Sequence, residues 1–138
     1  MTSYAYRLKL ARGFLEEAQQ DITLGRWRSV MDNAQLAVEN AAKGALSLIG
    51  PIGRTHQTGP LLREALQHER FSKTQREKAA RLAELAESLG PDLHIQTDYG
   101  DEAGGLTPWE LFDEADARQA LAMAEEALEL AESIGQDR

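Results

Sequence analysis

Residues 26–48 read RWRSVMDNAQLAVENAAKGALSL, and this stretch decides the fold. Its apolar residues recur every three or four positions, at Trp27, Val30, Ala34, Val38, Ala41, Ala45 and Leu48. This spacing places them on one face of an α-helix. Gly50 and Pro51 end the pattern, because proline lacks the N–H group that would continue the helix. The stretch therefore predicts a helix from Trp27 to Leu48 with one buried face.

A second helical pattern comes just before it. The same spacing relates the apolar residues Tyr4, Leu8, Ala11, Leu15, Ala18 and Ile22. Gly25 supplies a left-handed stop, so we expect a helix over about residues 3–24. Only Gly25 and Arg26 separate the two helices. Two helices joined so closely must fold back on each other as an antiparallel hairpin.

The middle of the chain predicts two more helices. Pro60 suits the first turn of a short helix that runs to His68. Backbone N–H groups in the first turn have no acceptor within the helix, so a proline there loses no hydrogen bond. Ser72 and Gln75 are spaced as a capping box and open a helix of about residues 73–89. A glycine- and proline-rich loop of about ten residues precedes both of these helices and follows the hairpin.

The last third of the chain predicts a long loop and a final helix. Residues 91–112 show no sustained period, so we expect a loop with one helical turn near 108–111. Asp113 can cap a last helix of about residues 114–134. Two aromatic side chains of the loop are expected to pack on the bundle: Tyr99 and Trp109.

The pattern as a whole predicts an all-α protein. No alternating run of Val, Ile or Thr reaches four residues, so strand signals are absent. A chain of 138 residues is the length of one domain. We expect a single domain over residues 1–138, an antiparallel up-and-down helical bundle of four to five helices.

Composition and charge exclude several classes of protein. The chain has no cysteine, which excludes disulfide frameworks, thiolate zinc sites and cysteine nucleophiles. A net charge of −8 argues against a protein that coats nucleic acids. The apolar runs are too short to span a bilayer and no cationic leader opens the chain, so a cytoplasmic location is expected.

The charge is divided unevenly along the chain. Residues 1–70 carry nine Lys and Arg against seven Asp and Glu, whereas residues 71–138 carry six against sixteen. The acidic second half is read as the solvated exterior of the later helices. A phosphate-bearing ligand is therefore expected only locally, in the first half.

Two polar constellations are candidate ligand-binding sites. In the first, Arg54 offers a guanidinium fork for phosphate, and His56 adds an imidazole, the type of side chain that commonly exchanges protons near neutral pH. In the second, Asp98 beside Tyr99 could orient the imidazole of His94 as a carboxylate partner does. Each constellation also has a purely structural explanation. His56 would then serve only to cap the following helix, with Arg54 in solvent. The group around His94 and Asp98 would only fix the loop through hydrogen bonds.

A third pattern is the pair Arg63 and His68. Cleavage of RNA without a metal needs a base for the 2′-hydroxyl and a cation for the phosphate, and this pair supplies both. Positions five apart are about 140° apart around a helix, so the pair would act across a dimer. The three histidines show no metal-ligand spacing, so neither a metal site nor a cofactor is expected.

Alanine-rich helix faces and leftover apolar stripes bear on oligomerisation. Close packing within one chain is one explanation of the alanines. The other is that a leftover stripe buries against a second copy of the chain, since an exposed apolar stripe is otherwise a liability. The two candidate stripes are Tyr6, Leu10 and Phe14 on the first helix, and Leu130 and Ile134 on the last.

The order of these segments resembles the HEPN domain family of small prokaryotic helical proteins. Residues 11–25 (ARGFLEEAQQDITLG) lead into residues 26–48, and the most telling matches are Gly25-Arg26-Trp27, Ala34-Gln35, Ala37-Val38-Glu39, Ala41 and Lys43. Thr55-His56-Gln57 with Leu61-Leu62, Asp98-Tyr99-Gly100-Asp101 and a closing helix follow. The chain has His94 where small members often carry arginine.

The resemblance implies a helical bundle, usually a homodimer, that associates with nucleotides or RNA. It also implies a minimal nucleotidyltransferase as partner in a toxin–antitoxin pair. The first hypothesis is accordingly a binding module for such a partner or a nucleotide. The alternative is a metal-independent endoribonuclease toxin, because some members use an arginine followed by a histidine, here Arg63 and His68. A third hypothesis is a helical scaffold without a ligand.

Overall fold

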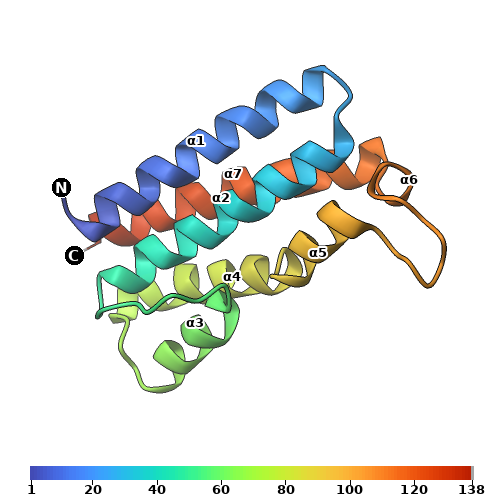
Figure 1. The fold of residues 1–138 in the computed structure, drawn as a ribbon. Coiled ribbons are helices and arrows are strands. Elements are labelled where there is room, and N and C mark those ends of the chain that lie inside the picture. Colours follow the sequence, from blue (N-terminus) through green and yellow to red (C-terminus); the bar gives the residue numbers. More distant parts are fainter. Residues whose placement is uncertain (138) are drawn as a thin grey trace.

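The computed structural model describes residues 1–137 and confirms the all-α class. Within these residues the only β-type pairing is an isolated bridge between Asp101 and Leu106. The helices, shown in Figure 1, are α1 (Ser3–Thr23), α2 (Trp27–Ser47), α3 (Thr58–Gln67), α4 (Lys73–Ser88), α5 (Asp92–Tyr99), α6 (Pro108–Leu111) and α7 (Glu114–Gln136).

The predicted hairpin of α1 and α2 is confirmed. Gly25 adopts a φ of 68°, a left-handed conformation that glycine reaches without strain, and the chain reverses there. At the other end of α1, the side chain of Thr2 accepts a hydrogen bond from the N–H of Ala5. The two helices therefore begin and end close to where the apolar spacing placed them.

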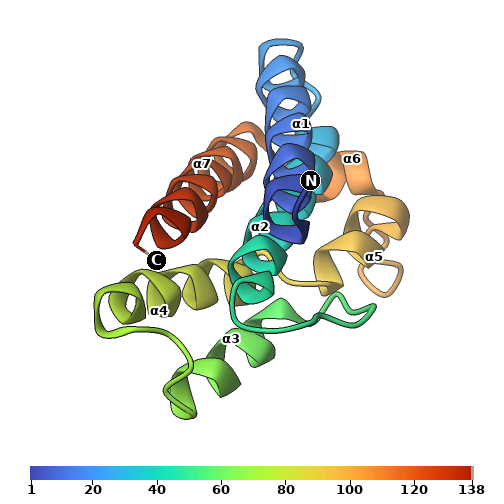
Figure 2. The ribbon, with the colours of Figure 1, turned by 90° about the vertical axis from the view of Figure 1, so that its left-hand side faces the viewer.

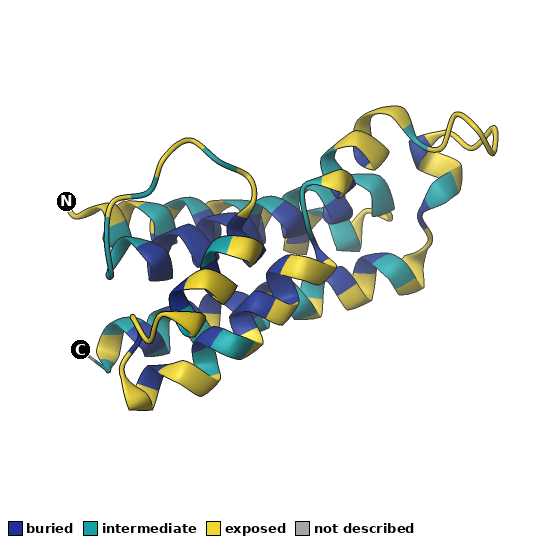
Figure 3. Cartoon of the chain, turned by 90° about the horizontal axis from the view of Figure 1, so that it is seen from below, coloured by how far each residue is buried: buried dark blue, intermediate teal, exposed yellow. Residues whose placement is uncertain are grey.

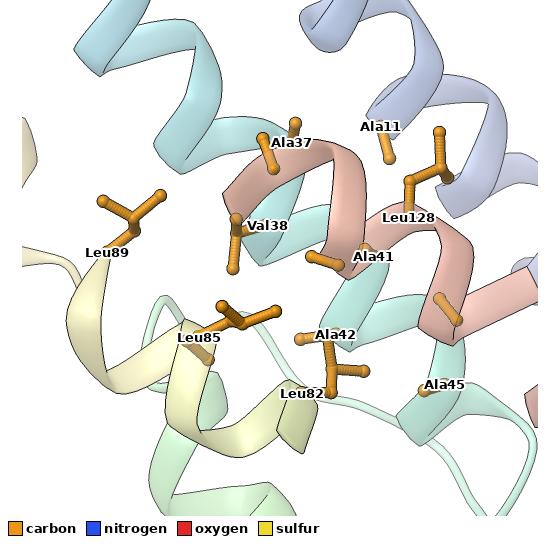
Figure 4. Close-up of a cluster of buried hydrophobic side chains, with 14 of the residues drawn as sticks. Ala11, Ala37, Val38, Ala41, Ala42, Ala45, Leu82, Leu85, Leu89 and Leu128 are labelled. Carbon is orange, nitrogen blue, oxygen red and sulfur yellow. The ribbon is translucent and has the colours of Figure 1, made fainter. Parts of the chain in front are cut away.

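Helix α2 is the centre of the bundle and contacts each of the six other helices of residues 1–137. Five of its fourteen buried residues are alanine, and small side chains let neighbouring helices approach closely. Figure 4 shows Ala41 and Ala42 of α2 among Leu82 and Leu85 of α4 and Leu128 of α7. The core of the domain is thus assembled around α2.

The other predicted helix starts are confirmed as well. Ser72 and Gln75 form the expected capping box at the start of α4. Asp113 caps α7 and accepts a hydrogen bond from the N–H of Asp116. Helix α3 begins at Thr58, two residues before Pro60. Within residues 1–137 no helix is both long and apolar enough to cross a membrane.

The expectation of a continuous loop over 91–112 is wrong. Residues Asp92–Tyr99 form α5, which raises the number of helices in residues 1–137 to seven. This helix buries only Leu93 and Thr97, so its sequence has no periodic apolar stripe from which the helix could be predicted. Figure 2 shows α5 on the opposite side of the α1–α2 hairpin from α7. The expected helical turn near 108–111 is confirmed as α6.

The expected packing of Tyr99 and Trp109 on the bundle is also wrong, because both side chains are exposed. Tyr99 is the last residue of α5 and Trp109 lies in the short α6. Residues 101–107, which join the two helices, are exposed throughout, and Figure 3 shows them as a loop at one end of the molecule. This end therefore presents aromatic side chains to solvent.

Candidate functional site: a charged cluster buried beneath two histidines

Helix α2 carries a polar row within its buried, alanine-rich surface. Gln35, Glu39 and Lys43 follow one another at intervals of one turn and are 1%, 4% and 7% exposed. Burying a charged side chain is expensive unless it is paired and hydrogen-bonded. The row therefore requires partners close by, and the fold supplies them.

Glu39 is the centre of this arrangement. Lys43 Nζ donates to Glu39 Oε2 at 3.3 Å, and Gln35 Nε2 donates to Glu39 Oε1 at 3.4 Å. His56 belongs to the segment between α2 and α3, and its Nδ1 lies 2.9 Å from Glu39 Oε1. An ionised carboxylate only accepts hydrogen bonds, so the Nδ1 of His56 carries the hydrogen in this contact.

The same contacts decide the charge of Glu39. Burial desolvates the carboxylate and on its own would raise its pKa. The hydrogen bond from His56 and the positive charge of Lys43 outweigh this effect, and the pKa of Glu39 lies below its ordinary value. Glu39 is accordingly an anion at neutral pH.

His94 reaches the same place from α5. Its Nε2 lies 3.8 Å from Glu39 Oε1, and its Nδ1 lies 3.7 Å from Asp32 Oδ1. The rings of His94 and His56 meet edge to face, with centroids 5.6 Å apart. We call Gln35, Glu39, Lys43, His56 and His94 the Glu39 cluster.

Two polar atoms of the Glu39 cluster have no hydrogen-bond partner among the described residues. They are the Nε2 of His94 and the Oε1 of Gln35, and both atoms are buried. Buried polar groups in folded proteins are nearly always satisfied, so an exception requires an explanation. A ligand that supplies the missing partners is one such explanation.

The structure joins two residues that the sequence placed in separate constellations, His56 and His94. Arg54, two residues before His56, is exposed. Sequence reasoning did not single out Gln35, Glu39, Lys43 and Asp32 as site residues. The signal was present, because a glutamate and a lysine one turn apart interrupt an alanine-rich apolar run.

The far end of α5 holds the remaining predicted ligand-binding residues. Arg28 Nη2 lies 3.5 Å from Asp98 Oδ1, and Arg28 Nε donates to the carbonyl oxygen of Thr97. Asp98 therefore pairs with Arg28, and the carboxylate beside His94 is that of Asp32. The guanidinium of Arg28 also lies 5.8 Å from the centre of the Trp109 ring.

This end of the molecule gathers exposed apolar side chains. Trp109 is 74% exposed and Tyr99 is 67% exposed. A hollow beside them is lined by Gly25, Arg26, Trp27, Arg28, Ser29 and Trp109. The exposed apolar residues here are Ile95, Tyr99, Leu106 and Trp109. We call these four residues, together with Arg28, the α5–α6 surface.

Arg63 lies on α3, and His68 is the residue that follows the end of this helix. Both nitrogens of the Arg63 fork donate to Glu87 of α4, Nε at 3.1 Å and Nη2 at 2.8 Å. This hydrogen bond raises the pKa of Arg63 and lowers that of Glu87. His68 caps the end of α3 and is exposed. The guanidinium that would bind a phosphate is thus already paired.

The fold and the Glu39 cluster define a class of small helical-bundle domain, built on a hairpin whose second helix carries buried charges. The chain belongs to the HEPN domain family, whose sequence pattern matches residues 4–134. The resemblance seen in the sequence is thereby confirmed.

The fold is shared with a solved structure of a bacterial protein. The chain is 24% identical to TT1696 from Thermus thermophilus, with a TM-score of 0.70, over 97% of this chain and 99% of that one. At this identity the likeness shows the fold alone. No curated protein sequence matches the chain.

Proposed function

We propose that this protein is the binding component of a two-protein system of the toxin–antitoxin type, a homodimeric HEPN module that docks on a nucleotidyltransferase. The observation that carries the proposal is the α5–α6 surface. Tyr99 and Trp109 are exposed, and the Trp109 ring lies 5.8 Å from the guanidinium of Arg28, which the fold holds in place. Aromatic residues and arginine are the side chains that most often dominate the energy of a protein interface.

The contacts of Arg28 indicate a surface that is preorganised for binding. Arg28 is anchored by the carbonyl of Thr97 and by Asp98, so little of its freedom remains to be lost on binding. Ile95 and Tyr99 lie on α5 and Trp109 lies on α6, two short helices that contact each other, and Leu106 lies in the loop between them. A partner would therefore meet a preformed patch.

The same surface also suits a nucleotide or an RNA end held together with the partner. An exposed indole stacks on bases, and a guanidinium binds phosphate in a planar fork. Because the chain carries a net charge of −8, such a contact would stay local. Arg54, His56 and His94 remain the second proposed location for a phosphate-bearing ligand.

Co-purification with a minimal nucleotidyltransferase tests the proposal. We expect a stable complex that Trp109→Ala weakens at least ~10-fold, since truncation of an interface anchor costs about 2 kcal/mol or more. Arg28→Ala should weaken it too, whereas Arg81→Ala, which removes an exposed arginine of α4, should not. A complex of unchanged affinity in Trp109→Ala and Arg28→Ala would remove the α5–α6 surface from the proposal.

Incubation with RNA in EDTA tests the ribonuclease alternative. The pairing of Arg63 with Glu87 leaves no free fork at that position, so we expect the RNA to stay intact. Products that form in EDTA and disappear in His68→Ala or Arg63→Ala would establish the alternative in place of the binding module.

A further inference from the structure

Three potential metal ligands converge in the Glu39 cluster. Glu39, His56 and His94 each offer one ligand atom, and these atoms all lie within 4.8 Å of one another. They come from three separate elements: α2, the segment before α3, and α5. We propose that Glu39, His56 and His94 bind one transition-metal ion of the Zn²⁺ class.

The separations of the ligand atoms fit such an ion. Zn²⁺ binds nitrogen and carboxylate oxygen at about 2.0–2.2 Å in a tetrahedron, which places neighbouring ligand atoms about 3.3–3.6 Å apart. Glu39 Oε1 lies 2.9 Å from His56 Nδ1 and 3.8 Å from His94 Nε2. The two observed distances bracket the required one. Small side-chain rotations therefore form the site once the hydrogen of His56 moves from Nδ1 to Nε2, because only a nitrogen without its hydrogen binds the ion.

His94 provides an independent reason for a ligand. Its Nε2 is buried without a hydrogen-bond partner and lies on the side of the ring that faces Glu39. A metal ion would supply the missing partner for this nitrogen. On the other side of the ring, Nδ1 lies 3.7 Å from Asp32 Oδ1. A carboxylate behind the second nitrogen is the arrangement that orients metal-binding histidines.

The remaining residues of the cluster orient the carboxylate of Glu39 through hydrogen bonds. Lys43 holds Oε2 of Glu39, which leaves Oε1 directed to the two histidines. Gln35 donates to Oε1 and adds to its orientation. The positive charge of Lys43 repels a metal cation nearby, and the carboxylate of Asp32 offsets part of this repulsion. With the metal ion bound, the site keeps a net positive charge, which favours an anionic fourth ligand such as hydroxide or phosphate.

The chemistry of the ligand set selects the kind of ion. Two imidazole nitrogens with one carboxylate suit Zn²⁺, Co²⁺ or Ni²⁺, whereas Mg²⁺ and Ca²⁺ prefer oxygen ligands. The side chain of His56 is 66% exposed, so a fourth coordination position would be open to solvent. Sequence spacing predicts no metal site, because the ligands are far apart in the chain and only the fold unites them.

Calorimetric titration of the purified full chain with Zn²⁺ tests the proposal, with Co²⁺ as a spectroscopic probe. We expect one ion per chain and the visible absorption of tetrahedral Co²⁺. His56→Ala and Glu39→Gln should each weaken Zn²⁺ binding at least ~100-fold, and Asp32→Asn about 10-fold, since partners behind a metal ligand are worth about 10- to 100-fold. Mg²⁺ should not bind.

His68→Gln is the matched control, because it removes the one histidine outside the cluster. Zn²⁺ binding at full affinity in His56→Ala, or no Zn²⁺ binding by the native chain, would overturn the proposal. His56 is exposed, so its variant should keep the native circular dichroism. The measurement contains neither partner nor nucleotide, and its outcome is therefore independent of the function proposed above.

Discussion

Glu39 and Lys43 form an ion pair one turn apart on α2, and both side chains are buried inside the bundle. Such a pair seldom stabilises a fold relative to apolar residues of the same size, because both charges lose their hydration. Its presence at the centre of the helix that contacts all the others therefore indicates a role beyond packing. The same reasoning predicts what happens when one partner is removed.

Lys43→Met should destabilise the protein by about 3 kcal/mol, because it leaves the carboxylate of Glu39 buried without its cation. Chemical unfolding followed by circular dichroism measures this change. The double variant Glu39→Gln/Lys43→Met removes both charges and should recover at least ~1 kcal/mol of the loss. Equal stabilities of the single and double variants would show that the two side chains are not coupled.

Arg28→Ala should loosen α5 without unfolding the bundle. The guanidinium holds the carbonyl of Thr97 and the carboxylate of Asp98, and a hydrogen bond to a charged group is worth about 1.5–3 kcal/mol. We expect amide hydrogens of residues 92–99 to exchange at least ~10-fold faster, while those of α2 and α7 keep their rates. Unchanged exchange over 92–99 would mean that α5 is held by its buried residues alone.

Ala124→Leu tests the close packing of the helices. Ala124 of α7 is fully buried in the core cluster, so a larger side chain must displace its neighbours. Overpacking of this kind costs about 1–3 kcal/mol. Ala122→Leu makes the same change on the exposed side of α7 and should alter stability by less than ~0.5 kcal/mol. Similar thermal midpoints for the two variants would contradict the close packing.

The long helices could be predicted from the sequence because each buries a regular apolar stripe and carries a cap. Helix α5 could not, since Leu93 and Thr97 are its only buried residues and one of them is polar. The Glu39 cluster was missed for a different reason. His56 and His94 were recognised as candidates, but their meeting at Glu39 depends on how α5 and the segment before α3 pack on α2. No local spacing encodes that contact.

The last prediction concerns the homodimer. Ile134 is fully buried within the chain, which removes one of the two apolar stripes proposed for dimerisation. Tyr6 is exposed and Leu10 and Phe14 are half-buried, so the stripe on α1 remains available. We expect light scattering to give twice the 15.2 kDa mass of one chain.

Tyr6→Asp/Leu10→Asp should raise the dimer dissociation constant at least ~100-fold, because the interface would bury unpaired carboxylates. Leu24→Asp introduces one carboxylate at an exposed residue just after the other end of α1, beyond the stripe, and should leave the mass unchanged. A dimer that survives the double variant would place the interface elsewhere. The α5–α6 surface would then be the next face to test, and Trp109→Asp would distinguish dimerisation there from docking of the nucleotidyltransferase.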